Sequence, residues 1–328
     1  MTARNEPKYL QVRLRRPSSL WPVARLLSVS AVAALCVTLL TAPATGLLVF
    51  WDLVVPVLPA LFLVAPGLWR NVCPMAAANQ VPRVLGLTRG FELPRVLVRH
   101  GYAIALALFF ALVLARGAVF ETDPRALAAL LAGAVVAALA AGVVFKGKSG
   151  FCGGVCPLRP VQGLYGQTPF AEVPTSHCRP CLGCTPNCSD LKPRTAFLDD
   201  LRDADPRRGA YRKLFAGSFP GFILAFYTLP GGGAAGAGAS AARFAVLTLA
   251  SLGAFFVVDA LSRPRLGLAP ALWGALAFNA FYWFNVPAVA AAAGRLAGGP
   301  APEWVVWEGR ALALGLSAAW LVRTLRKE

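Results

Sequence analysis

The chain reads Cys152-Gly-Gly-Val-Cys156-Pro157 near its middle and, a little later, Cys178-Arg-Pro-Cys181-Leu-Gly-Cys184-Thr-Pro-Asn-Cys188. Six of its eight cysteines lie in these two motifs. Two-residue spacers allow successive thiolates to converge on neighbouring metal ions. The polar, Pro- and Gly-rich region that carries the motifs, Lys146 to Lys213, separates two blocks of apolar sequence and therefore decides how the chain is organised.

The spacing from Cys178 to Cys188 closely matches the bacterial ferredoxin run, which holds 4Fe-4S clusters. It predicts that Cys178, Cys181 and Cys184 bind one cluster, whereas the fourth cysteine of such a run usually reaches a partner cluster. Zinc and disulfides are the alternatives. Zinc sites usually combine two closely spaced ligand pairs that are separated by a longer spacer. Three cysteines in a row at two-residue spacing therefore favour an iron–sulfur cluster.

The composition is that of a polytopic membrane protein. The 328 residues are 57% hydrophobic and only 14% charged, whereas about a quarter of the residues of a soluble domain are charged. The net charge of +17 lies mostly beside apolar segments. Because no basic stripe interleaved with aromatics is present, no nucleic-acid partner is expected.

Eight apolar runs are long enough to cross a hydrocarbon core of about 30 Å. They are Val23 to Leu40, Leu47 to Leu68, Gly101 to Phe120, Leu127 to Phe145, Leu214 to Leu229, Phe244 to Leu261, Leu268 to Ala292, and Trp304 to Val322. We therefore predict an all-α integral membrane protein of about eight transmembrane helices, with a ferredoxin-like iron–sulfur insertion between helices 4 and 5. The expected parts are a tail (1–22), helices 1 to 4 with a Cys-Pro loop near 70–100 (23–146), the iron–sulfur region (147–213) and helices 5 to 8 (214–328).

The distribution of basic residues predicts the orientation. Of the 32 Lys and Arg residues, 27 lie on one side of the predicted spans, in the two tails and every second connection. The other five lie on the opposite side: Arg116, Arg125, Arg243, Arg295 and Arg310. Since Lys and Arg are retained on the cytoplasmic side, both termini and the cysteine region are expected in the cytoplasm, at a bacterial-type inner membrane. Cytosolic thiols are kept reduced, which argues against disulfides.

A short motif occurs twice. The second apolar segment is followed by Val72-Cys73-Pro74, and the fourth by Val155-Cys156-Pro157. Two successive hairpins would thus deliver Val-Cys-Pro to the same face of the membrane, as in a duplicated hairpin. Coincidence in a chain rich in Val and Pro is the alternative.

Paired hairpins that end in Cys-Pro, followed by a ferredoxin run, resemble the NapH/NosR/CcoG group of membrane-bound 4Fe-4S polyferredoxins. The resemblance covers roughly Leu47 to Cys188. It implies that Cys152 to Pro157 is a cytoplasmic Cys-x-x-x-Cys-Pro motif. It also implies electron transfer across or along the membrane, or metal reduction for assembly of another enzyme. Trp69 stands where the first such motif would begin with Cys, and no flavin-binding domain is recognised.

The number of cysteines leaves the number of clusters open. Cys36 lies in the middle of an apolar run and is expected to be a small buried hydrophobe. The others are Cys73, Cys152, Cys156, Cys178, Cys181, Cys184 and Cys188, whereas two clusters with full thiolate ligation need about eight. Either one cluster uses Cys188 as its fourth ligand, or two are bound and one has a non-Cys or open position.

Histidine and methionine are too rare for membrane haem. His100 and His177 are at a predicted membrane edge, and the methionines are Met1 and Met75, so no haem is expected. His177 precedes Cys178 and could be a ligand or donate a hydrogen bond to sulfur. A solvated loop histidine is the commoner case and is our prediction.

Four ionisable residues fall within apolar runs, where they are costly and often functional. Asp52 and Asp259 lie near predicted ends and are expected to reach the interface. Glu308 and Arg310 could pair with other helices or mark a proton or quinone path. Near the cysteines, four basic residues have topogenic value or could dock an acidic soluble carrier: Arg159, Arg179, Lys192 and Arg194.

The expected function is single-electron transfer between a cytoplasmic partner and the membrane quinone pool or a redox partner subunit. The alternatives are a factor that reduces or delivers metal for assembly, or a zinc-binding structural scaffold. No acid/base pair or nucleophile constellation is recognised, so any oxidoreductase activity would depend on partner subunits.

Overall fold

A computed structural model describes residues 20–146, 150–177, 193–202, 205–228, 237–262 and 265–327. Helices make up 82% of these residues, and no strands occur among them. A single parallel β-bridge joins Phe91 to Phe145. The predicted all-α class is confirmed.

Seven helical stretches in the described residues are long and apolar enough to span a membrane. They are Leu20–Thr41 (α1), Pro43–Val64, Arg95–Phe120, Pro124–Val144 (α7), Ala241–Leu261, Leu268–Leu296 (α12) and Glu303–Arg326 (α13). The second joins α2 (Pro43–Leu48), the π-helix η1 (Val49–Val54) and α3 (Val55–Val64); the third joins α6 (Arg95–Ala115) and the π-helix η2 (Arg116–Phe120). Seven of the eight expected spans are thus found, and the chain is a multi-pass membrane protein.

The remaining expected span, Leu214 to Leu229, corresponds up to Thr228 to α10 (Pro206–Thr228), which is not apolar enough to count among the seven; Leu229 lies outside the described residues. Protein surrounds this helix along much of its length, because α10 packs against α11 (Ala237–Leu261), α12 and α6. Its buried residues include Phe215, Ser218 and Phe222. A Cβ atom on Gly221 would lie 2.2 Å from the carbonyl oxygen of Leu247, so only glycine permits this approach of α10 to α11.

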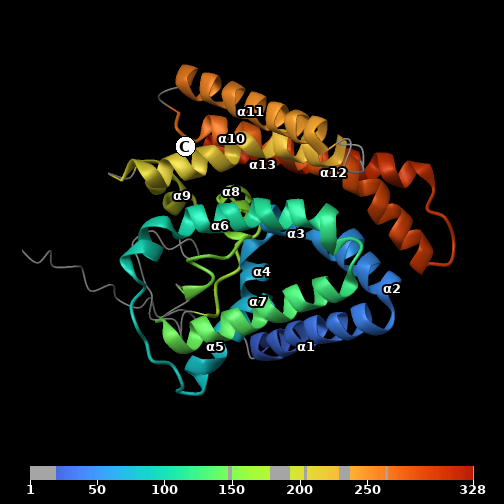
Figure 1. Ribbon diagram of the computed structural model, residues 1–328. Coiled ribbons are helices and arrows are strands. Elements are labelled where there is room, and N and C mark those ends of the chain that lie inside the picture. The colour runs from blue at the N-terminus through green and yellow to red at the C-terminus, as the bar shows by residue number, and fades with distance from the viewer. Residues whose placement is uncertain are drawn as a thin grey trace, which may run out of the picture.

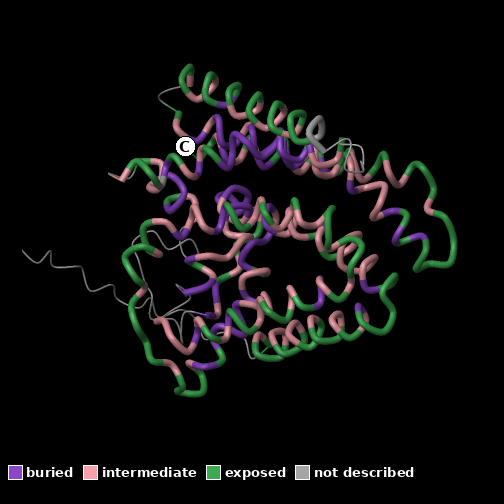
Figure 2. Tube along the Cα trace, viewed as in Figure 1, coloured by how far each residue is buried: buried purple, intermediate pink, exposed green. Residues whose placement is uncertain are grey.

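The long helices form two groups (Figure 1). In one, α1 packs against α7; in the other, α10, α11, α12 and α13 pack together, and α3 and α6 lie between the two groups. The largest hydrophobic cluster joins residues of α3, α6, α10, α12 and α13, with Phe62, Phe215 and Trp320 among the buried side chains. The outer turns of α1 and α11 are exposed, as expected of surfaces that meet lipid (Figure 2).

Shorter helices gather at one end of the bundle. They are α4 (Pro66–Val72), α5 (Pro74–Val84), α8 (Arg159–Tyr165) and α9 (Pro193–Arg202). In Figure 1 this end lies on the left, while the turns between α1 and α2, α6 and α7, and α12 and α13 lie on the right. We call the left-hand end the cysteine end, because Cys73, Cys152 and Cys156 belong to its connections.

Candidate metal centre

Cys73 forms the corner between α4 and α5. Its N–H donates to the carbonyl of Trp69 (2.7 Å), and its carbonyl accepts from Ala77 N–H (2.9 Å). Proline disfavours the helical conformation in the residue before it, and Cys73 accordingly has ψ 121° ahead of Pro74. The Val-Cys-Pro motif therefore ends one helix and starts the next, which leaves the thiol at a fixed corner.

Cys152 and Cys156 lie in a tight loop ahead of α8. The carbonyl of Phe151 accepts from the N–H groups of Gly154 (3.3 Å), Val155 (3.0 Å) and Cys156 (3.0 Å). The Cys156 carbonyl then accepts from Arg159 N–H (3.0 Å), where α8 begins. Both cysteines pack against a small apolar cluster of Ala78, Ala138 and Phe151, so α5, α7 and this loop share one core.

The two Val-Cys-Pro motifs meet. The pKa of the Cys156 thiol is raised to about 12, by burial first and then by the neighbouring Cys73 thiol; N–H groups of Leu158 and Arg159 that donate to its sulfur act in the opposite direction. The thiols of two successive hairpins are thus close enough to interact electrostatically. N–H donors directed at a sulfur are also a feature of sites that stabilise a metal-bound thiolate.

The chain that leads into the ferredoxin run is fixed to α4 by Asn71, whose side chain is buried. Asn71 donates from Nδ2 to the Pro174 carbonyl (2.9 Å) and accepts at Oδ1 from both N–H and Oγ of Ser176 (2.7 Å each). Arg25 of α1 donates to the Asn71 carbonyl (3.1 Å) and to Ser176 Oγ. The chain therefore reaches Ser176 beside the helix that ends at Cys73.

Asn71 was not singled out from the sequence. Its position offered one signal, since it is a polar amide at the end of an apolar run and stands two places before Cys73. Buried amides of this kind are normally retained by the hydrogen bonds they make.

The four cysteines of the ferredoxin run lie outside the described residues, as do Arg179 and Lys192. Among the residues that are described, no three His, Cys, Asp or Glu side chains gather as a metal-binding group. The ligand set predicted from the sequence therefore stays a prediction. What the described part contributes is Cys73, Cys152 and Cys156 and the connection that ends at His177.

His177 corrects one expectation. It was predicted to be a solvated loop histidine, but only 1% of its surface is exposed. Ser176, next to it, is held by Asn71, and His177 N–H lies 3.4 Å from Thr175 Oγ1. These contacts turn the side chain into the protein, which local sequence alone could not indicate.

Arg159 and Arg194 make contacts within the protein, and a docking surface for an acidic carrier stays a prediction. The Arg159 guanidinium lies 5.4 Å from the Tyr102 ring centre, and burial and then the nearby Arg212 guanidinium lower the pKa of Arg159. Arg194 donates to the Gln167 side chain and to the Thr324 carbonyl (3.3 Å). Both side chains therefore join elements at the cysteine end within the protein.

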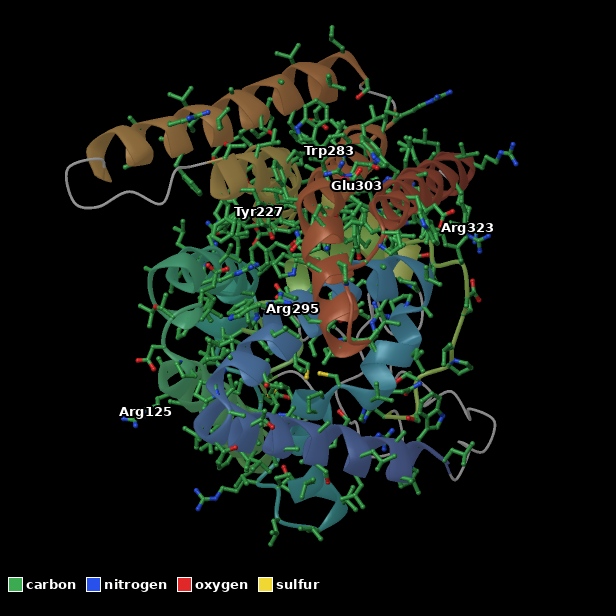
Figure 3. The ribbon with its side chains drawn as sticks, turned by 90° about the vertical axis from the view of Figure 1, so that its right-hand side faces the viewer. Arg125, Tyr227, Trp283, Arg295, Glu303 and Arg323 are labelled. Atoms are coloured by element: carbon green, nitrogen blue, oxygen red, sulfur yellow. The ribbon has the colours of Figure 1, made fainter. Side chains whose placement is uncertain are left out.

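Two of the four ionisable residues in the spans form ion pairs. Asp259 accepts from Lys213 at 2.7 Å at the cysteine end. Asp52 lies 3.8 Å from Arg295, which is labelled in Figure 3 in a view onto the opposite end. The two carboxylates were expected to extend to the membrane interface. Each is stabilised in addition by an ion pair with a basic residue on another helix.

The other two residues lie at the start of α13. The Arg310 guanidinium lies 4.0 Å from the Trp283 ring centre and 5.1 Å from that of Trp307, and it donates to the Trp283 carbonyl (3.0 Å). Glu308 is exposed. Arg310 therefore joins α12 to α13 through aromatic contacts, which is typical of a membrane-interface belt.

The fold and the cysteine end define the class: a multi-pass, all-α membrane protein with two Cys-Pro corners that meet at one end of the bundle. No protein-family model, curated protein or solved structure matches the chain.

Proposed function

We propose that the chain is a membrane-anchored iron–sulfur protein that passes single electrons between a cytoplasmic partner and the quinone pool or a redox partner subunit. The observation that carries the proposal is the meeting of Cys73 and Cys156, which come from separate hairpins. Two partly buried thiols that interact electrostatically, next to a cysteine run with ferredoxin spacing, are the arrangement that a shared metal site requires.

The cofactor of the proposal is a 4Fe-4S cluster, or two. Cys178, Cys181 and Cys184 would hold one cluster, completed by Cys156, Cys73 or Cys188. Cys152 would belong to a second site if there is one. A bound cluster supplies one-electron oxidation and reduction at iron, and hydrogen bonds to sulfur and burial set its potential.

The residues around Cys156 fit such a group in two respects. The N–H groups of Leu158 and Arg159 donate to the Cys156 sulfur, and Ala78, Ala138 and Phe151 form an apolar wall beside Cys152 and Cys156. Such a wall keeps water from a cluster, and the N–H donors stabilise its reduced form.

The chain connection adds support for a shared site. Ser176 is held beside Asn71, and the sequence continues through His177 directly into Cys178. Ser176, two residues before the ferredoxin run, therefore lies in space beside Asn71, which is two residues before the corner at Cys73. At the far end of the run, Arg194 ties α9 to Gln167, two residues after the end of α8, and to α13.

Reversible reduction tests the proposal. Full-length protein purified without air should absorb broadly in the visible range, lose much of that absorption on addition of dithionite, and regain it on reoxidation. A colourless protein that contains zinc would support the structural scaffold instead, because zinc has no redox chemistry in proteins.

A further inference from the structure

A segment outside the membrane spans exposes large apolar side chains. At the end of α5 and in the connection to α6, the exposed fractions are 74% for Val84, 63% for Leu85, 63% for Leu87 and 55% for Phe91. We call residues 84–91 the apolar loop; it is coloured as exposed at the cysteine end in Figure 2. A cluster of such side chains on a rigid surface commonly marks a contact with lipid or protein.

Backbone hydrogen bonds fix the apolar loop to the end of α7. Arg89 N–H donates to the Val143 carbonyl (2.7 Å), Phe91 N–H donates to the Val144 carbonyl (2.9 Å), and Lys146 N–H donates to the Phe91 carbonyl (2.8 Å). Gly86 and Gly90 supply the positive φ angles of 72° and 67° that its turns require. The apolar side chains are therefore held in place at the surface.

These bonds also fix the depth of the loop in the membrane. Val144 is the last residue of the span Pro124–Val144, so the loop is attached where that span leaves the hydrocarbon core. In Figure 1, α5 and the chain that follows it lie at the outer edge of the group formed by α1 and α7. Apolar side chains at this depth and on this edge reach the boundary between lipid headgroups and acyl chains.

The charge of the segment complements anionic lipid. Arg89, Arg95 and Arg99 are exposed. Glu92, the acidic residue of the segment, is bonded to Lys146. Basic side chains beside inserted apolar residues are the combination that attaches proteins to anionic membrane surfaces.

We propose that the apolar loop is an interfacial anchor, which inserts Leu87 and Phe91 beside α7 and binds anionic phospholipid headgroups through Arg89 and Arg95. A soluble protein that covers the same residues is the alternative. The proposal does not depend on the iron–sulfur assignment. Because α5 begins directly after Cys73 and ends at Val84, the anchor would hold this helix at the membrane surface.

Photo-crosslinking tests the proposal in the full-length protein. A benzophenone amino acid is placed at Leu87 in proteoliposomes of equal parts phosphatidylglycerol and phosphatidylcholine. We expect lipid adducts by mass spectrometry, at a yield similar to that from Leu249, an exposed position within a span. Glu172, which is exposed at the cysteine end, is the aqueous control and should give none.

The lipid class and the competing partner are separate readouts. We expect phosphatidylglycerol among the Leu87 adducts to be enriched roughly fivefold, the factor associated with one basic side chain near an anionic surface. R89Q/R95Q should remove the enrichment and leave the crosslink. No lipid adduct at Leu87 while Leu249 gives one, or a protein adduct at Leu87 in native membranes, would overturn the anchor. Lipid adducts at Leu87 without enrichment of phosphatidylglycerol would overturn the proposal that Arg89 and Arg95 bind anionic headgroups.

Discussion

At the scale of single residues, Asn71 connects three segments that are distant in sequence. Its side chain holds Pro174 and Ser176, and its carbonyl accepts from Arg25 of α1. Buried amides with several good partners restrict the chain to one arrangement, since an unpaired partner would be costly. We infer that Asn71 determines where the cysteine run begins relative to Cys73.

Replacing Asn71 by alanine should therefore affect metal content as well as stability. The change leaves the Ser176 N–H and the Pro174 carbonyl without the Asn71 side chain as a partner, at a cost of about 1–3 kcal/mol in the free energy of unfolding. We expect a lower thermal midpoint in detergent and a loss of bound iron. Asn279→Ala is the matched control, because Asn279 bonds Ser317 within the spans; it should lower stability and leave iron content per folded protein unchanged. Equal iron loss in both variants would contradict the role of Asn71.

Substitution of individual cysteines tests the ligand set. Cys181→Ser and Cys156→Ser should each remove or alter the low-temperature EPR signal of the reduced protein, because a changed ligand alters the cluster's electronic structure. Cys36→Ser should leave the signal as it is. Arg25 marks the cysteine end of α1, because it bonds Asn71 and Ser176. Cys36 lies roughly 16 Å further along this helix, and its sulfur contacts the Ala128 carbonyl at 3.9 Å. A signal that depends on Cys36 and not on Cys181 would mean that the motif has been misinterpreted.

Residue-level predictions succeeded where they depended on chain geometry and failed where they depended on tertiary contacts. Both Val-Cys-Pro motifs were expected on the same face of the membrane, and both lie at the cysteine end. The burial of His177 and the contacts of Arg159 within the protein arise from partners in distant segments, Asn71 near the first and Tyr102 beside the second. No local pattern identifies such partners in advance.

At the scale of elements, α10 differs from the other long helices. It carries Arg212 and Lys213 near its start and small residues in its middle, so its hydropathy is low. The burial of its central turns explains how the helix tolerates this sequence, because its neighbours are protein and not lipid. The apolar run from Leu214 predicted a span here, but the mean hydropathy of α10 is too low to place it among the seven, because hydropathy measures affinity for lipid and not contact with protein.

The contact between α10 and α11 predicts a specific defect. Gly221→Leu would force a side chain against the Leu247 carbonyl, which is 2.2 Å from the position of a Cβ atom. We expect a loss of about 1–3 kcal/mol in stability, measured by thermal unfolding in detergent. Gly253→Leu is the control, because no atom lies within 4 Å of its Cβ position. Similar losses in the two variants would count against close packing as the cause.

At the scale of the whole molecule, the topology depends on whether α10 crosses the membrane. Seven spans alone would place the two termini on opposite sides, whereas seven together with α10 place them on the same side. The excess of basic residues at the cysteine end predicts the second arrangement, with that end in the cytoplasm.

Reporter fusions measure this topology. Fusions after Gly86 and after Lys327 should report the cytoplasm, and a fusion after Gly298, in the turn between α12 and α13, should report the opposite side. A fusion at Gly86 that reports the opposite side would place Cys73 and Cys156 in an oxidising compartment. That result would remove the argument against disulfides.

The metal content of the whole protein tests the central claim most directly. Iron, acid-labile sulfide and zinc are measured per polypeptide in full-length protein purified without air. The account predicts iron and sulfide in equal amounts, about four of each for one 4Fe-4S cluster or about eight for two, with little zinc. Zinc without sulfide, or no bound metal in a protein that is otherwise folded, would contradict it.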